Sequence, residues 1–554
     1  MRRAVAVAVF LLFPTLAAAS ATERYVVSLE RGTSPLRGTA LLRDIDGEAA
    51  VPRERAVLRF RVLDGFAADL TAEEAARLRR SPGVRYVEQV VERRILGGGL
   101  SAAADASWSL SGQNVPFGID LVRARDVWSV TRGESVNVAV LDTGVDYKHP
   151  DLAGVWAGGF NTYAQSNDPM DDNNHGTHVA GTIAAMDNDF GVVGVAPGVK
   201  LWGVKVLRGD GVGSSDRVIA GIDWVIQQKR LLGGNWIINL SLGSAGSTTA
   251  EREAIERANT EGILIVAASG NESTATMPAA VSYPAAYPGV LAVGAVNEIR
   301  QLAAFSNQGP ELALVAPGVD VMSTLRVGAG KVAAVQNRTT FFTGSALEGS
   351  GRGETSGEFV FCGIGNEGQF PSEVAGRIAV INRGEITFAL KAKRAKEAGA
   401  TAVIIVNNNT DPLNFTLIDP ADPTAATFDW PITIALTQSD GQALLARPAD
   451  TIKMAIDDYG SLNGTSMASP HAAGVAALAW ALAPRATASQ IRNALILTAS
   501  DLGAPGFDTA YGHGLIDALE AGKMLNPAAF GLPSTPEPDP EPSGRRTLRR
   551  RGGS

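Results

Sequence analysis

Apolar residues gather in short runs between about residues 136 and 296, and each run is long enough for one buried strand. Between these runs, residues 215–230 and 249–261 carry apolar positions at helical spacing. Strands that alternate with helices predict a three-layer α/β domain, with a mostly parallel sheet between two helical layers. A functional site is then expected at the carboxyl ends of the strands. The predicted strands are residues 136–141, 201–207, 236–242, 263–268 and 290–296.

A separate pattern precedes this domain. Strands are predicted at residues 24–29 and 56–62, and a capping sequence at Thr71 opens a helix. A turn at residues 81–83 then leads into one more strand. This order predicts a small α+β unit.

The main domain is also interrupted. Its alternation stops near Thr324 and resumes near Tyr459, and the block between them has a strand–helix–strand order of its own. We therefore predict an inserted, β-rich domain. The elements expected in it are residues 376–384, 388–398, 401–408 and 430–436.

The two ends of the chain have compositions that suggest processing and disorder. Two arginines precede an apolar run at residues 4–16, and small residues follow, which is the layout of a secretory signal peptide. The run is short for a membrane span and no cysteine offers a lipid anchor, so we expect an exported protein without a membrane anchor. A Gly/Ala/Ser stretch at residues 97–107 predicts a cleavable linker, and the tail from Pro527 is predicted to be disordered.

Composition narrows the function classes. The chain has 554 residues, 45% hydrophobic and 19% charged, which is typical of a folded protein with more than one domain. A formal net charge of −8 gives no basic footprint for nucleic acid. The single cysteine, Cys362, excludes an intrachain disulfide and is expected to be a buried apolar residue. We expect a monomer without an organic cofactor.

The first candidate for chemistry is Ser466, in the sequence Leu-Asn-Gly-Thr-Ser-Met-Ala-Ser-Pro-His. A long alanine-rich run follows, so we predict a tight turn that presents Ser466 at the start of a buried helix. Free N–H groups and the helix dipole there favour developing negative charge. A helix cap is the commoner use of such a serine. A nucleophile would also need a base, an acid that orients the base, and an oxyanion donor.

Two other stretches supply an acid and a base. An apolar strand ends at Asp142, where a carboxylate is tolerated only if a partner satisfies it. His175 opens an apolar helix in the sequence Asn-His-Gly-Thr-His. Each has a simpler interpretation alone, as a turn carboxylate and a helix cap. A metal site at His175 and His178 is weakly supported, because no third ligand lies at a suitable spacing.

Taken together, the three stretches follow the chain order Asp, His, Ser that subtilisin uses. Asp-Thr-Gly, His-Gly-Thr-His and Gly-Thr-Ser-Met-Ala resemble the signature blocks of the subtilisin-like serine proteases. The resemblance covers nearly all of residues 113–325 and 459–525. It implies that Ser466 attacks the peptide carbonyl to form an acyl-enzyme. It also implies that His175 transfers the proton, that Asp142 orients His175, and that His178 is structural.

The resemblance also implies the surroundings of the reaction. Asn271 is expected to donate its side-chain amide to the oxyanion beside the Ser466 N–H, although an Asn after Gly more often marks a turn. Ser282 lies where the family has its first specificity pocket. No acid is visible at the base of this pocket, so we expect broad preference for apolar or aromatic residues, with Glu272 at the rim adding tolerance for Lys or Arg. Two edge segments are expected to bind an extended peptide by backbone hydrogen bonds: Gly211, Val212, Gly213 and Ser241, Leu242, Gly243.

A structural Ca²⁺ site is implied in the same way, and a solvated acidic loop is the alternative. Calcium takes about six to eight oxygen ligands of mixed kind. The matching ligands are the side chains of Gln113, Asp151 and Asn188 and the carbonyl oxygens of Met186, Phe190 and Val192.

The remaining segments resemble accessory domains of proteases. The N-terminal unit resembles an inhibitory propeptide, and the block at residues 376–408 resembles a protease-associated (PA) domain. We therefore predict a secreted, bacterial serine endopeptidase, made as a self-processing zymogen that acts on peptides or proteins and is inhibited by its own propeptide. The predicted divisions are a signal peptide (1–21), a propeptide (22–100), a linker (101–112), a catalytic domain (113–325 and 459–526), a PA-like insert (326–458) and a disordered tail (527–554).

Two other function classes fit the sequence less well. A non-catalytic peptide-binding protein with this fold would lack part of the triad or the oxyanion donor, and all are present. An esterase of the α/β-hydrolase type would need Gly-x-Ser-x-Gly, but the sequence around Ser466 lacks the second glycine and the triad order differs.

Overall fold

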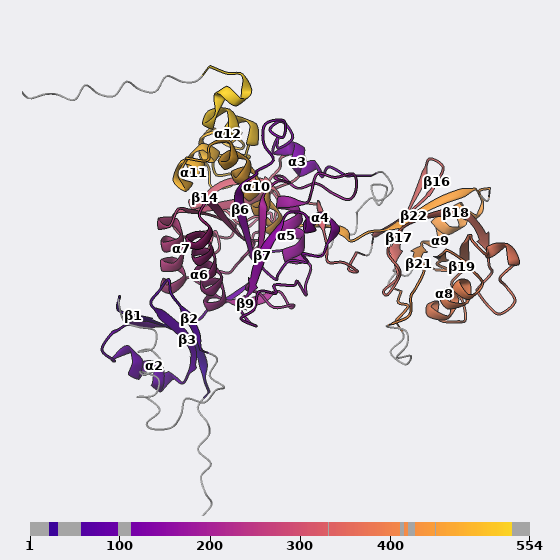
Figure 1. Cartoon of the computed structure of the whole chain (residues 1–554), viewed down its shortest axis with the longest axis horizontal. Helices are drawn as coiled ribbons and strands as arrows, with labels where there is room; N and C mark the ends of the chain where they lie inside the picture. The colour runs from indigo at the N-terminus through magenta and orange to yellow at the C-terminus, as the bar shows by residue number, and fades with distance from the viewer. Residues whose placement is uncertain are drawn as a thin grey trace, which may run out of the picture. The chain divides into compact units, whose positions relative to one another are not determined.

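The computed structural model describes residues 21–31, 57–97, 112–330, 332–409, 415–418, 427–448 and 450–533. They fall into two compact units, which divide between Val90 and Val91 (Figure 1). Residues 1–20 of the predicted signal peptide, residues 32–56 and 98–100 of the predicted propeptide, nearly all of the predicted linker and residues 534–554 of the predicted tail lie outside the described residues. In the part of the chain that is described, none of the helices has both the length and the apolar character needed to cross a membrane.

The first unit is a four-stranded antiparallel sheet in the order β2-β3-β1-β4, counted over its described residues. The predicted helix is confirmed, and Thr71 and Glu74 form a capping box at its start. The predicted strand at 56–62 is shorter, because the chain turns after Phe60 and a further strand begins at Gly65. The elements are β1 (Glu23–Leu29), β2 (Leu58–Phe60), β3 (Gly65–Leu70), α2 (Ala72–Arg79) and β4 (Val84–Gln89).

The second unit contains the predicted parallel sheet, with seven strands among the described residues in the order β14-β13-β12-β10-β6-β8-β7. Every neighbouring pair is parallel. The five predicted strands are confirmed, except that two of them end earlier: β10 ends at Leu240 and not at residue 242, and β8 ends at Lys205 and not at residue 207. The strands are β6 (Val136–Asp142), β7 (Trp156–Asn161), β8 (Lys200–Lys205), β10 (Asn235–Leu240), β12 (Ile263–Ala268), β13 (Val290–Val296) and β14 (Leu312–Pro317).

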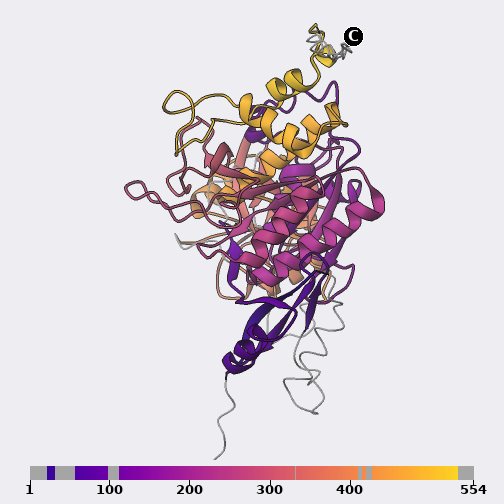
Figure 2. The same cartoon turned by 90° about the vertical axis from the view of Figure 1, so that its left-hand side faces the viewer.

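Helices cover both faces of this sheet (Figures 1 and 2). One face packs against α5 (His175–Ala184) and α10 (Thr465–Leu482), and the other against α6 (Ser215–Leu232) and α7 (Thr249–Thr260). Nearly every residue of α10 is buried, since sheet, α5 and α12 (Ala518–Leu525) surround it. Such a helix is apolar on all sides. The shorter helices are α3 (Phe117–Leu121), α4 (Pro150–Ala153) and α11 (Ala488–Leu497).

The predicted tail begins later than Pro527. Residues Pro527–Phe530 form a 3-10 helix, and Asn526 caps it through its side chain. Phe530 packs against the main core, which gives these residues the apolar contact that a disordered tail lacks.

The insert leaves and re-enters the main domain through one antiparallel pair, β15 (Val321–Thr324) and β23 (Tyr459–Leu462). This pair, called here the root hairpin, lies against α5. The hydroxyls of Ser323 and Thr324 donate to the carbonyl oxygens of His178 and Thr177, both at 2.8 Å. The insert is therefore anchored to the helix that begins at His175.

The insert itself is a closed barrel, with strand order β16-β17-β21-β20-β19-β18-β22. Alternate residues of β20 face an inner core (Ala402, Ile404) and an outer core under α8 (Val403, Ile405). This explains its wholly apolar sequence. The elements are β16 (Val332–Asn337), β17 (Thr340–Ala346), β18 (Gly353–Phe361), a 3-10 helix (Ser372–Val374), β19 (Ile378–Asn382), α8 (Phe388–Glu397), β20 (Ala402–Val406), β21 (Ile432–Leu436), α9 (Gln438–Leu445) and β22 (Thr451–Ile456).

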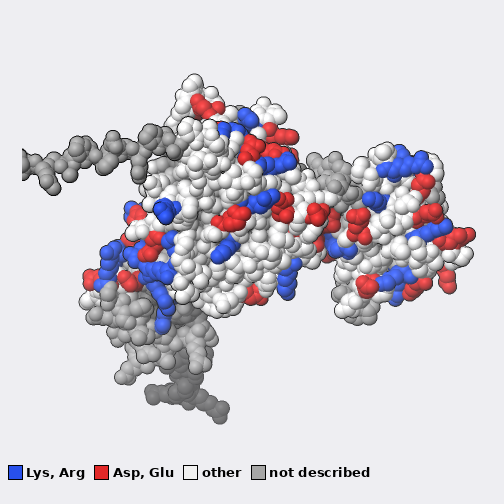
Figure 3. Space-filling model, turned by 45° about the horizontal axis from the view of Figure 1, so that its top comes forward, with Lys and Arg blue, Asp and Glu red and all other residues white. Residues whose placement is uncertain are grey.

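Cys362 lies in the outer core of the barrel and is fully buried, as predicted. Burial raises the pKa of its thiol to about 11, so the reactive thiolate is disfavoured. On the face shown in Figure 3, acidic and basic side chains are interspersed over the described parts of the main domain and the barrel. No field of one sign covers the described surface there.

Replacing Gly181 with alanine tests the packing of α5 against the root hairpin. A Cβ at Gly181 would lie 2.2 Å from Thr324 Oγ1 and 2.5 Å from Ser323 Oγ. Helix propensity favours alanine by up to about 1 kcal/mol, but overpacking costs about 1–3 kcal/mol and both displaced hydroxyls bond to α5. We therefore expect Gly181→Ala to lower the melting temperature in thermal unfolding. Gly357→Ala, where the nearest atoms are 4.0 Å away, is the control; an equal effect in both variants would contradict this packing.

Candidate active site

The three candidate residues come from the ends of three core elements. Asp142 is the last residue of β6, His175 is the first residue of α5, and Ser466 lies in the first turn of α10. All three are buried. The acid therefore lies at the carboxyl edge of the sheet, where the sequence predicted the site. The histidine and the serine lie at the starts of two helices that cover one face of the sheet.

Asp142 and His175 are paired directly. The Asp142 Oδ1 atom lies 2.8 Å from His175 Nδ1, and it also accepts the N–H of Thr143 at 2.7 Å. A carboxylate accepts, so His175 carries its proton on Nδ1. Its Nε2 atom is buried and has no hydrogen-bond partner among the described residues. The imidazole therefore presents an unprotonated nitrogen, as a general base requires.

The Ser466 hydroxyl is not bonded to His175 in this conformation. It donates to the carbonyl oxygen of Ser241 at 2.8 Å and accepts the N–H of Leu96 at 3.2 Å. The neighbouring Gly464 has a φ of +154°, and a Cβ there would lie 2.5 Å from the carbonyl oxygen of Leu96. Glycine is required because a side chain would block the approach of the Leu96 segment.

Asn271 faces the same turn. Its Oδ1 atom accepts from both the N–H and the hydroxyl of Thr465, at 2.9 and 2.8 Å. Because Oδ1 already accepts both bonds from Thr465, the Nδ2 group is the end of the amide that can donate to a ligand. A Cβ at Gly464 would lie 3.1 Å from Nδ2, so this donor lies beside the carbonyl of Leu96. Thr465 orients Asn271, and sequence reasoning missed this role although Thr465 stands inside the serine motif.

The two predicted edge segments bind an extended strand from the same chain. This strand, β5 (Glu92–Ile95), lies between β9 (Val212–Ser214) and β11 (Leu242–Gly243) in antiparallel pairing. The N–H of Ile95 also donates to the carbonyl oxygen of Gly211 at 3.0 Å. Five of the six predicted edge residues thus contact the strand: Gly211, Val212, Gly213, Leu242 and Gly243. The sixth, Ser241, contacts Ser466.

The residue after the strand, Leu96, fills the region around Ser282. Leu96 is 3% exposed, and its Cδ1 atom would lie 3.1 Å from a Cβ at Gly243. The same Cβ would lie 3.4 Å from Ser282 Cβ, so both residues border the leucine side chain. Glu272 is exposed and accepts from the side chains of Asn307 and Ser282 at 2.6 and 3.3 Å.

The residues of the predicted calcium site also come together. Gln113 Nε2 lies 2.7 Å from Met186 O, 3.2 Å from Asn188 Oδ1 and 3.3 Å from Val192 O. Asp151 accepts from Asn188 Nδ2 at 2.8 Å and from the N–H of Val192 at 3.0 Å. Phe190 follows in the same loop, and its N–H donates to Asn188 Oδ1. The sequence did not point to Tyr459, whose hydroxyl donates to Asp151 at 2.8 Å.

His178 has a structural environment. Its Nε2–H donates to the carbonyl oxygens of Val321 and Gly460, at 2.9 and 3.0 Å, and so joins α5 to both strands of the root hairpin. Among the described residues, no group of three His, Cys, Asp or Glu side chains is arranged to hold a metal. Burial lowers the pKa of His178 to about 3 and that of His471 to about 4.

Comparison with known proteins agrees with this geometry. A family model described as Subtilase family matches residues 133–357 and 336–514, more than half of the chain. The chain belongs to the subtilase family. A model described as Peptidase inhibitor I9 matches residues 39–95, so the N-terminal segment of the subtilase is a propeptide of the inhibitor type.

Individual relatives support the same assignment. Subtilisin E from Bacillus subtilis is 37% identical over 310 residues, which cover 56% of the subtilase and 75% of that protein. A thermostable alkaline protease from Halalkalibacterium halodurans is 42% identical over 258 residues, covering 46% and 64%. The subtilase is thus a serine endopeptidase of the subtilisin type.

Two solved structures resemble its fold. The psychrophilic subtilisin-like protease Apa1 from the Antarctic psychrotroph Pseudoalteromonas sp. AS-11 is 30% identical, with a TM-score of 0.50, and the match covers 76% of the subtilase and 100% of that chain. Fervidolysin from Fervidobacterium pennivorans, a keratinolytic enzyme related to subtilisin, has a TM-score of 0.57 over 91% of the subtilase and 61% of its own chain. At 22% identity, it supports the fold alone.

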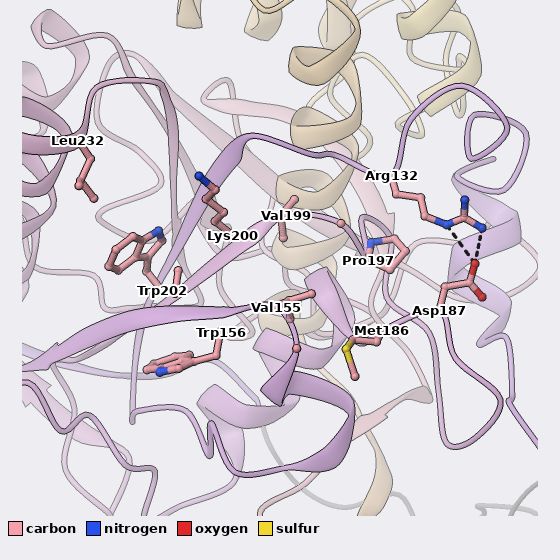
Figure 4. Close-up of a pocket in the computed structure, with 13 residues that line it drawn as sticks. Arg132, Val155, Trp156, Met186, Asp187, Pro197, Val199, Lys200, Trp202 and Leu232 are labelled. Carbon is pink, nitrogen blue, oxygen red and sulfur yellow. Dashed lines mark hydrogen bonds and ion pairs between the residues drawn. The ribbon is translucent and has the colours of Figure 1, made fainter.

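A hollow of about 840 Å³ on the subtilase lies away from these residues (Figure 4). Its lining includes Val155 and Trp156, next to the start of β7, and Lys200 and Trp202 at the start of β8. These are the amino ends of the parallel strands, whereas the candidate active site lies at their carboxyl ends. The hollow is therefore not part of the active site.

The buried histidines predict how stability depends on pH. Below their ordinary pKa of 6.5, His178 and His471 gain a proton in the unfolded chain but not in the folded one. Because the unfolded state then binds more protons, the free energy of unfolding must fall as pH decreases from about 6.5 toward 4. At pH 4.5 the loss is on the order of 2–3 kcal/mol for each histidine.

Thermal unfolding of the Ser466→Ala protein between pH 4.5 and 8 measures this effect without self-digestion. The His178→Gln variant should show a weaker pH dependence, although it is less stable at pH 8. His513→Gln is the control, because His513 is exposed. If His178→Gln and His513→Gln weaken the pH dependence of stability equally, the dependence cannot be assigned to the buried ring of His178.

Proposed function

We propose that the subtilase is a secreted endopeptidase in which Ser466 is the nucleophile, His175 the general base and Asp142 the residue that orients it. The observation that supports this most directly is the 2.8 Å contact between Asp142 Oδ1 and His175 Nδ1. It fixes one tautomer of the imidazole and leaves Nε2 free to take a proton. The apolar leader sequence supports export, and the relatives that support the family are bacterial proteases.

In the proposed reaction, the Ser466 hydroxyl leaves the carbonyl of Ser241 and turns toward His175. His175 Nε2 takes the serine proton as Oγ attacks the peptide carbonyl, and the resulting imidazolium is stabilised by Asp142. The proton then passes to the leaving amine, and water hydrolyses the acyl-enzyme.

The oxyanion of the tetrahedral intermediate would be held by the N–H of Ser466 and the Nδ2 donor of Asn271. The carbonyl oxygen of Leu96 supports this, because it already accepts from the Ser466 N–H at 3.4 Å. Thr465 holds Asn271 by its Oδ1 atom, so that Nδ2 is directed to the oxyanion without reorganisation. Removing one such donor costs about 10²–10³ in turnover in related cases.

The seating of Leu96 supports self-processing at the Leu96–Gly97 bond. The Leu96 carbonyl lies against the proposed oxyanion donors, and the strand before it occupies the substrate edges. After cleavage, the same segment would block the site as an intramolecular inhibitor, in keeping with the I9 match. The enclosed leucine side chain also supports a preference for apolar or aromatic residues before the cut.

We further propose that the barrel is a PA domain. Its closed sheet, with the parallel neighbours β18, β19, β20 and β21 and the helix α8 packed outside, is compatible with the sequence resemblance. Its role in the enzyme is separate from the chemistry, because none of the proposed catalytic residues belongs to it.

We also propose that a Ca²⁺ ion is held by Gln113, Asp151, Met186, Asn188, Phe190 and Val192. The fit rests on three oxygens, from Met186, Asn188 and Val192, that converge on one nitrogen of the Gln113 amide. If this amide is turned, its oxygen joins the same cluster, which gives the hard oxygen donors that calcium prefers. The ion would stabilise the loop and take no part in the reaction.

Self-processing can be tested with wild-type protein and the Ser466→Ala variant. We expect wild type to release an N-terminal fragment that ends in Leu96 with a free carboxylate, and Ser466→Ala to accumulate as the intact precursor. Mass spectrometry of the fragment gives the cut bond, and casein hydrolysis reports activity. Identical unprocessed precursor from both proteins, with no hydrolysis, would rule out the proposed mechanism.

Calcium binding can be tested by chelation. A bound ion at about 100 times its dissociation constant contributes about 2.7 kcal/mol, so EDTA should lower the melting temperature of the Ser466→Ala protein, and added Ca²⁺ should restore it. In an Asn188→Ala background the shift should disappear. Asp189→Asn, an exposed residue of the same loop, should retain it. No shift in the parent protein would remove calcium from the proposal.

A further inference from the structure

The most unusual buried group near the active site is the guanidinium of Arg93, in strand β5. Its side chain is 0% exposed, although it is long and charged. Removing such a charge from water costs several kcal/mol unless it is paired and hydrogen-bonded. The pocket that receives it must therefore supply specific partners.

Glu251, in the first turn of α7, is the main partner and is also 0% exposed. Its two oxygens accept from Arg93 Nε at 3.0 Å and from Arg93 Nη2 at 2.5 Å. The remaining Nη1 donates to Ser244 Oγ at 2.5 Å and to the carbonyl oxygen of Glu92 at 3.2 Å. This two-pronged pairing matches the planar fork of arginine and not the point charge of lysine.

The pairing also dominates the electrostatics of the pocket. Burial by itself would lower the pKa of Arg93, but the carboxylate of Glu251 outweighs it, and the pKa is raised. The backbone of Glu251 is held by the main domain, because its N–H donates to Thr248 Oγ1 at 3.2 Å and Thr248 is in turn bonded to the Tyr287 hydroxyl. The start of α7, from which the carboxylate projects, is therefore anchored independently of Arg93.

The register of β5 gives the position of this pocket in a substrate. Leu96 precedes the bond that faces Ser466, and Arg93 is the fourth residue before that bond. Its backbone pairs with Gly213, as expected for a continuous strand that ends at Leu96. Arg94, the next residue, is different: its side chain is 61% exposed and, among the residues that the structure describes, pairs only with Glu92. The chain therefore buries one of two adjacent arginines, and the one that it buries meets Glu251.

We propose that Glu251 makes this pocket selective for arginine at the fourth position before the scissile bond. The inference rests on the proposed function, since it takes β5 as a substrate bound in register. The substrate class is an extended peptide with arginine at the fourth position and an apolar residue at the first. Basic specificity is thus placed at the fourth residue before the cut, away from the region around Ser282 that receives Leu96.

The test uses mature enzyme and a peptide series built on Glu-Arg-Arg-Ile-Leu followed by a fluorogenic leaving group. The residue that corresponds to Arg93 is Arg, Lys, Ala or Glu. We expect kcat/KM to fall about 10- to 100-fold from Arg to Ala, because hydrogen bonds to a buried charge contribute about that much. Lysine should lie between them, and Glu should be the poorest.

Variants then assign the preference to one residue. Glu251→Gln keeps the shape of the pocket, and it should reduce the preference for Arg over Ala to a few-fold. Glu251→Leu should reverse the order of the Arg and Ala peptides. Glu256→Gln is the matched control, because Glu256 lies on the same helix with a side chain that is 53% exposed. It should leave the whole series unchanged.

The outcomes separate this inference from the proposed function. If wild type cleaves all peptides with similar kcat/KM, the enzyme assignment stands and selectivity at Glu251 is wrong. If Glu251→Gln keeps the full preference for Arg, the preference has another origin and the role of Glu251 is overturned. If wild-type enzyme cleaves no peptide of the series and no casein, the proposed function itself fails and takes the inference with it.

Discussion

A carboxylate buried at the end of a strand is the constraint on which the active site depends. Asp142 is fully buried, and such a group is tolerated only with a hydrogen-bonded partner. His175 is that partner, so the carboxylate fixes the tautomer of the ring and the position of the first residue of α5. The same α5 packs against α10, which begins at the turn of Ser466. One buried charge therefore links the parallel sheet to both helices that carry the proposed base and nucleophile.

The root hairpin extends this link to the insert. His178, one helical turn after His175, bonds to carbonyls of both hairpin strands, and Arg326 bonds through its N–H and its Nε to the side chain of Asn174. Asn174 has a φ of +125°, a conformation that an L-residue adopts only under strain, and its contacts with Arg326 oppose relaxation. The residue before the proposed catalytic base is thus held by the first residues of the insert. The barrel supplies none of the proposed catalytic residues, but the segments that attach it contact the helix that begins at His175.

The sequence predicted most of this site because each proposed catalytic residue sits in a short local motif. The central strands were also predictable, since burial on both faces makes them continuously apolar. Edge strand β7 was not, because it is half exposed and glycines interrupt its pattern. Glu251 was not predictable either: in the sequence it is an ordinary acid in the first turn of a helix, and its partner lies 158 residues away. Pairings over such distances arise only when the chain is folded.

In its proposed role, the contact between Arg93 and Glu251 also explains how one segment can be both a substrate and an inhibitor. It lies four residues from the reacting bond, so it stabilises the bound precursor, the transition state and the cut product about equally. Binding energy of this kind increases affinity without accelerating the chemical step. It therefore favours retention of the cleaved strand, whose departure would leave Glu251 without its partner until water enters the pocket. A pocket that recognises arginine by burying it is, by the same physics, slow to release its own propeptide.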